Sequence, residues 1–178
     1  MKLCNNLILG YIFTTVLGVI LHFTYDWSGK NAIVGLFSAT SESTWEHLKL
    51  VFYPMLLLTI INLICMKKNN YSSNEITSFL SSRTIGILAA MLMTVVLFYT
   101  LTGVFGKTAD FVNIAIYFVA VAFGFYIENR LKRDDFSIKP VYSVIILCLF
   151  TFLFISLTYS APDVGIFKNP LLFTTLKK

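Results

Sequence analysis

Charged side chains are scarce in this chain: Asp, Glu, Lys and Arg together make up only 13% of its 178 residues. Hydrophobic residues make up 57%, and the mean hydropathy is +0.77. A soluble domain would carry roughly 25% charged residues. The scarcity of charge therefore argues against a soluble globular domain and favours a protein that lies in a membrane.

The motifs of several common enzyme classes are missing as well. The sequence contains no H-E-x-x-H, no H-x-x-x-H and no G-x-S-x-G, and it has only two histidines. None of the three cysteines forms a C-x-x-C pair, so neither a thiolate zinc site nor a disulfide framework is expected. The net charge of +5 fits Lys and Arg that mark cytoplasmic loops, and we expect no nucleic-acid partner.

Long runs without a charged residue are the main positive feature of the sequence. They cover residues 3–25, 50–66, 84–106, 111–127 and 140–162. A helix needs about 20 apolar residues to cross ~30 Å of hydrocarbon, where only helices and closed barrels satisfy their backbone. Because the runs lack the alternation of a strand, we predict an all-α fold, a single domain built as a bundle of five transmembrane helices. The predicted helices are 4–26, 44–66, 84–106, 109–128 and 140–160, followed by a tail at 161–178.

The distribution of Lys and Arg predicts the orientation of this bundle. Eight of the 14 basic residues fall on one side, including the clusters "KK" at 67–68 and "RLKR" at 130–133. The positive-inside rule places that side, with the N-terminus, in the cytoplasm. We therefore predict a multi-pass protein of the bacterial cytoplasmic membrane with its C-terminus outside. The 26–46 loop, which carries several unusual polar residues, then faces the outside.

The segment "SESTWEHLKL" at 41–50 is the most polar part of that outer side. Ser43 and Glu46 match a capping box, which explains both if a helix begins here. The capping box does not explain Glu42 or His47. The following uncharged run is so short that the helix must include His47 to span the bilayer, and ionisable groups at that depth are functional candidates. Glu46 and His47 are therefore candidate catalytic residues, against the alternative of a plain helix cap and interfacial anchor.

A second set of candidates suggests a metal site. His22 and Asp26 are four residues apart, so they share a helix face, and a carboxylate partner fixes the tautomer of an imidazole. Small residues precede His22 at four-residue steps, which favours an inward-facing side for this row. His47 of the 41–50 segment and Asp163 of the tail are expected on the same side. The candidate metal ligands are therefore His22, Asp26, His47 and Asp163. Imidazole and carboxylate ligands suit a divalent metal such as Zn²⁺ with one position open to water.

A third set is spread along the fourth predicted helix. Asp110, Asn113 and Tyr117 recur at spacings that place them on one helix face. With Glu42, they form a candidate site for a substrate or an ion. For Asp110 alone, the alternative is a carboxylate that complements the helix dipole.

Three segments resemble the motifs of a known group of proteins. "HFTYDWSG" at 22–29, "SESTWEHLK" at 41–49 and "APDVGIFKNP" at 161–170 are similar to H-x-x-Y-x-W-S-G, N-E-S-x-W-E-H-x-K and P-P-H-x-x-L-F-x-D-P. These motifs belong to small uncharacterised polytopic proteins of low-GC Gram-positive bacteria. The resemblance covers nearly the whole chain and implies topology but no chemistry. Ser41, Asp163 and Asn169 depart from the motifs, and Asp163 exchanges one type of metal ligand for another.

These observations lead to three hypotheses of function. The leading one is an outward-facing site that binds a divalent cation in the lipid bilayer and acts on a lipid or a small amphiphile. The first alternative is a small transporter or transporter subunit that uses the carboxylates as a cation or proton site. The second is a non-catalytic sensor, immunity or assembly protein that binds a partner through the outer motif. At the level of sequence all three stay open, as do enzymatic activity and oligomeric state.

Overall fold

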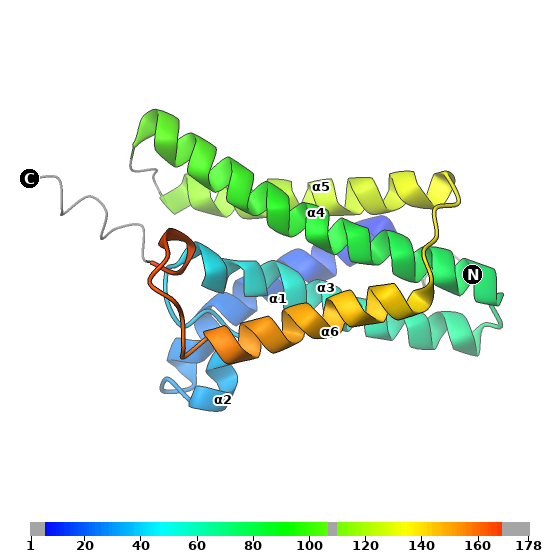
Figure 1. The fold of residues 1–178 in the computed structure, drawn as a ribbon, viewed down its shortest axis with the longest axis horizontal. Helices are drawn as coiled ribbons and strands as arrows, with labels where there is room; N and C mark the ends of the chain where they lie inside the picture. The colour runs from blue at the N-terminus through cyan, green and yellow to red at the C-terminus, as the bar shows by residue number, and fades with distance from the viewer. Residues whose placement is uncertain (1–5, 107–109, 169–178) are drawn as a thin grey trace, which may run out of the picture.

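The computed structural model describes residues 6–106 and 110–168, and within these ranges every regular element is a helix (Figure 1). Five helices are long and apolar enough to cross a membrane. They are α1 (Leu7–Trp27), α3 (Thr44–Lys68), α4 (Ser73–Phe105), α5 (Asp110–Arg133) and α6 (Pro140–Leu157). Two short elements, α2 (Ala32–Gly35) and the 3₁₀ helix η1 (Gly165–Phe167), lie in the loops. The prediction of an all-α protein with five long apolar helices is confirmed.

The largest difference from the predicted boundaries is the start of α4, at Ser73 rather than at residue 84. A complete capping box explains this start. The Ser72 hydroxyl accepts a hydrogen bond from the Glu75 amide at 3.3 Å, and the Glu75 carboxylate accepts one from the Ser72 amide at 2.8 Å. The 33-residue helix is about 50 Å long at 1.5 Å per residue, so it is longer than the ~30 Å thickness of a hydrocarbon layer.

α3 is the central helix of the bundle and packs against both α1 and α4. Val51, Phe52 and Met55 on α3 are completely buried. α4 and α5 lie side by side along one flank (Figure 1). Their backbones approach closely at Gly86, where an added Cβ would lie only 2.8 Å from the carbonyl oxygen of Gly124. Small residues at such crossings are typical of helices that pack inside a bilayer.

Large apolar side chains cover much of the outer surface. Leu92, Phe111 and Phe152 are each exposed by more than 60%. Extended apolar surface of this kind is unusual on a soluble monomer, whereas lipid would cover it in a membrane. The surface and the five helices are therefore compatible with an integral membrane protein.

One expectation about the cysteines is wrong. Cys65, near the end of α3, is disulfide-bonded, whereas Cys148 on α6 is a free thiol. The absence of a C-x-x-C pair gave no reason to expect this bond, since disulfide partners can be distant in sequence.

Candidate metal site

The candidate site lies where α1 ends and α3 begins, and the loop that carries α2 joins these two helices (Figure 1). Ser38 fixes this loop to the last turns of α1. Its hydroxyl donates a hydrogen bond to the Leu21 carbonyl and accepts one from the Tyr25 amide at 3.1 Å. The loop is therefore held directly beside His22.

Lys49 fixes the same loop from the side of α3. The Lys49 side chain is fully buried, and its ammonium group lies 2.8 Å from the Glu46 carboxylate and 2.7 Å from the Thr158 hydroxyl. It also donates to the carbonyl oxygens of Gly35 and Ser38, at 3.0 and 3.4 Å. One ammonium group thus connects the loop, α3 and the end of α6.

Glu46 completes this network and forms only half of the expected capping box. The Ser43 hydroxyl accepts a hydrogen bond from the Glu46 amide at 3.3 Å, as an N-cap should. The Glu46 carboxylate does not return to Ser43 but accepts from both the amide and the hydroxyl of Thr40, each at 2.8 Å. The Glu46 carboxylate is therefore engaged in an ion pair with Lys49 and in hydrogen bonds from Thr40.

His47 is oriented by the backbone of its own helix. Its Nδ1 lies 2.9 Å from the carbonyl oxygen of Ser43, so Nδ1 carries the proton and donates. The other ring nitrogen, Nε2, lies 3.4 Å from a carboxylate oxygen of Glu42. A carbonyl that fixes the tautomer in this way is the usual outer partner of a metal-binding imidazole.

His22 approaches the same point from α1. The centroids of the His22 and His47 rings are 5.4 Å apart. Nδ1 of His22 is buried and has no hydrogen-bond partner among the described residues. A buried polar atom normally finds a partner, so this nitrogen is free to bind a group that the site takes up.

His22, Glu42 and His47 each offer one ligand atom, and these three atoms lie within 4.8 Å of one another. Ligand atoms at ~2.0–2.1 Å from a tetrahedral Zn²⁺ are about 3.4 Å apart, so only small side-chain adjustments would be needed. Two imidazoles and one carboxylate match a zinc donor set that leaves a fourth position open. The side chains of His47 and Glu42 are 31% and 57% exposed, so that position is accessible.

The charge of Glu42 suits this role. Without a metal, a hydrogen bond from a protonated Nε2 of His47 holds the pKa of the Glu42 carboxyl below its usual value, although partial burial acts in the opposite direction; a bound metal ion would take the place of that proton. Because the folded-state pKa is lowered, the contact with His47 contributes stability at neutral pH and loses it as the pH falls through that pKa. Glu42 is thus ionised at neutral pH, as a carboxylate ligand must be.

The two other predicted metal ligands, Asp26 and Asp163, are not among the three clustered residues. Asp26 is exposed near the end of α1. Asp163 is 89% exposed and forms an ion pair with Lys168 at 2.6 Å. Of the predicted set, only His22 and His47 come together, and Glu42 takes the place of the carboxylate.

The predicted polar face on α5 has a different arrangement from the one expected. The side chain of Asp110 lies outside the described part of the chain, and Asn113 is exposed. Tyr117 points to the neighbouring helix, where its hydroxyl donates to the carbonyl oxygen of Thr14 at 2.9 Å. Tyr117 therefore serves the packing of α5 against α1.

A buried ionic group at the other end of the bundle was not foreseen. Arg83 of α4 binds the Glu128 carboxylate of α5 at two points, 2.6 and 3.1 Å, and both side chains are almost fully buried. Lys132 also contacts Glu128. The predicted helix boundaries leave Arg83 and Lys132 in the loops between helices. The four-residue spacing of Glu128 and Lys132 was a visible signal, but Arg83 is 45 positions from Glu128.

Comparison with known proteins identifies a family but no activity. The model of a family of unknown function (DUF6512) matches residues 2–172 of the chain. No curated protein matches the sequence, and no solved structure matches the fold.

Proposed function

The chain belongs to this family of unknown function, and we propose that it is an integral membrane protein whose His22, Glu42 and His47 bind a divalent cation. The carrying observation is the approach of their ligand atoms to within 4.8 Å. Two further features support it: the Nδ1 of His47 is held by the Ser43 carbonyl, and the buried Nδ1 of His22 has no hydrogen-bond partner in the part of the chain that the structure describes. Zn²⁺ is the best match, because it combines imidazole and carboxylate ligands in a four-coordinate site.

The open position of the site supports a role beyond binding. A Zn²⁺ ion with three protein ligands lowers the pKa of a bound water to about 7, which makes a nucleophile available at neutral pH. The site lies at one end of a bundle of apolar helices, and if these helices span a bilayer it would lie near the depth where lipid headgroups meet water. We therefore propose a lipid headgroup or another small amphiphile as the molecule that reaches the fourth position.

Removal of either imidazole is expected to abolish stoichiometric metal binding. The protein purified in detergent should hold about one Zn²⁺ per chain, measured by elemental analysis after equilibration with buffered Zn²⁺. His22→Ala and His47→Ala should weaken the affinity by at least about 100-fold, because loss of an outer partner alone costs 10–100-fold. Glu42→Gln should act in the same direction.

Two conservative variants serve as matched controls. Asp26→Asn and Asp163→Asn remove nearby carboxylates that lie outside the cluster and should retain full metal content. Thermal melts of all five variants would show that the chain is folded. Equal zinc in the wild type and in the folded His22→Ala and His47→Ala proteins would contradict the proposal.

We also propose an orientation and a source. The chain would be one of the polytopic proteins of low-GC Gram-positive bacteria that it resembles, with the metal site facing outside. The basic cluster at 130–133 supports this orientation. The disulfide of Cys65 argues against it, because disulfides persist mainly in oxidising compartments and Cys65 is at the basic end. In intact cells, a membrane-impermeant reagent should modify a cysteine placed at residue 163 but not one at residue 134. The reverse pattern would put the metal site inside.

A further inference from the structure

Two helices of this chain begin with the pattern S-x-x-E, and the two glutamates make different contacts. At the start of α4, the Glu75 carboxylate returns to its own N-cap and accepts from the amide and the hydroxyl of Ser72, each at 2.8 Å. At the start of α3, Ser43 is the N-cap, but the Glu46 carboxylate passes it and accepts from Thr40. A capping box does not require a contact with Thr40, so this contact has another role.

The contact with Thr40 closes the short segment from Thr40 to Ser43 at both of its ends. The Glu46 amide donates to the Ser43 hydroxyl at 3.3 Å, and the Glu46 carboxylate accepts from the amide and the hydroxyl of Thr40 at 2.8 Å. Glu42 is the one carboxylate of the metal cluster, and it lies within this segment. Glu46 therefore fixes the backbone on both sides of a metal ligand.

Glu42 needs such support because its side chain is 57% exposed, whereas that of Glu46 is only 5% exposed. An exposed side chain samples many orientations, and ordering it on a ligand costs free energy. Glu46 is itself held in place, because the buried Lys49 ammonium lies 2.8 Å from its carboxylate. The backbone of the segment thus connects an exposed metal ligand to a buried ion pair.

We propose that Glu46 is a positioning residue of the metal site. Through Thr40 and Ser43 it holds the Glu42 carboxylate beside His47, whose Nε2 is 3.4 Å away, and so raises the affinity for the cation. Glu46 does not touch the cation, and its effect passes through Glu42. The inference rests on the proposed function, since it concerns the affinity of the same site. Residues that orient metal ligands typically change metal affinity by about 10–100-fold.

The test measures the Zn²⁺ affinity of the full-length protein in detergent by competition with a chromophoric chelator. Replacement of Glu46 alone would leave the buried Lys49 ammonium unpaired, so both test proteins also carry Lys49→Met. Gln at position 46 keeps an oxygen that accepts from Thr40, whereas Ala removes it. We expect the Glu46→Ala/Lys49→Met protein to bind Zn²⁺ at least about tenfold more weakly than the Glu46→Gln/Lys49→Met protein.

Addition of Glu42→Gln to both proteins separates positioning from a general structural effect. If Glu46 acts through Glu42, the difference between Ala and Gln at position 46 should disappear, because no carboxylate remains to be placed. A difference that persists undiminished would overturn the proposal. Equal affinities of the two proteins that retain Glu42 would overturn it as well.

The Thr40 side of the contact gives an independent test that leaves the buried ion pair intact. Thr40→Val removes one hydrogen bond to Glu46 and should weaken Zn²⁺ binding by about fivefold, whereas Thr40→Ser keeps the hydroxyl and should bind as the wild type does. If the Glu46→Ala/Lys49→Met protein does not fold, this pair decides. Equal affinities of Thr40→Val and Thr40→Ser would then overturn the proposal.

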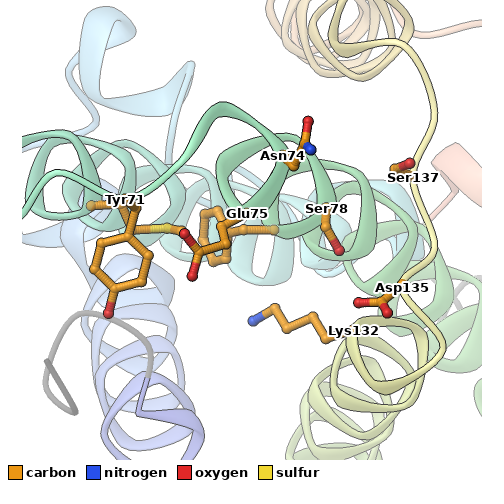
Figure 2. A pocket seen from close by; sticks show the side chains of 9 residues that line it. Tyr71, Asn74, Glu75, Ser78, Lys132, Asp135 and Ser137 are labelled. Carbon is orange, nitrogen blue, oxygen red and sulfur yellow. The ribbon is translucent and has the colours of Figure 1, made fainter.

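Glu75→Ala is the matched control, since it removes the glutamate of the ordinary capping box. Glu75 lines a cavity at the other end of the bundle, between the first turns of α4 and the end of α5 (Figure 2). This variant should leave the Zn²⁺ affinity unchanged. A wild type that binds no Zn²⁺ would refute the proposed function itself. Failure of the positioning role alone would instead show a wild type that binds Zn²⁺ and variants that match it.

Discussion

Replacement of Lys49 by methionine is expected to lower the free energy of unfolding by about 3–5 kcal/mol. The change leaves the buried Glu46 carboxylate without its cation. It also removes the donor that holds Gly35, Ser38 and Thr158. Reversible unfolding of the protein in mixed micelles, followed by circular dichroism, would measure the loss.

A second substitution and a control test this reason for the loss. Glu46→Gln in the Lys49→Met background removes the uncompensated charge and should restore part of the stability. Lys68→Met, at the exposed end of α3, should change the free energy of unfolding by less than about 0.5 kcal/mol. A Lys49→Met protein as stable as the Lys68→Met protein would mean that Lys49 reaches solvent and does not hold the loop.

Gly18→Ala is expected to cost about 2–4 kcal/mol of stability, although alanine is intrinsically the better helix former by about 1 kcal/mol. A Cβ at this position would lie 1.9 Å from the Tyr117 hydroxyl and 2.6 Å from the carbonyl oxygen of Leu50. The tyrosine can move, but the backbone of the central helix cannot do so without a shift of α1 against α3. The same unfolding assay would measure the effect.

Gly103→Ala is the matched control, since a Cβ there would meet nothing within 4 Å. This variant of α4 should be neutral or slightly more stable. Addition of Tyr117→Phe to Gly18→Ala should recover only part of the loss, because the Leu50 carbonyl remains in place. If Gly18→Ala and Gly103→Ala have the same effect, the close approach of α1 and α3 is not required.

The sequence predicted the five long helices because their signal is local. Runs without charge mark the hydrocarbon-crossing parts directly. The predicted start of α4 is too late, because the prediction follows the uncharged run and Glu75 and Arg83 lie before it. Their actual roles, in a cap and in a buried ion pair, keep these charges compatible with a helix.

The candidate site was predictable in part. His22 and His47 are the only histidines, and the topology places both at one end of two consecutive helices. The choice of Glu42 over Asp26 depends on how the loop folds. The Ser38–Leu21 and Thr40–Glu46 hydrogen bonds set that fold, and no helical spacing contains this information. The Lys49 contact with Thr158 spans 109 positions and was likewise out of reach of sequence patterns.

The central claim is that His22, Glu42 and His47 hold a divalent cation, and X-ray absorption spectroscopy of the zinc-loaded protein tests it most directly. The account predicts one Zn²⁺ with four nitrogen or oxygen neighbours at about 2.0–2.2 Å, two of them imidazoles. Only one imidazole should remain in the His22→Ala protein if it is loaded at high zinc. A spectrum with sulfur ligands, or one that is unchanged when both histidines are replaced, would contradict the account.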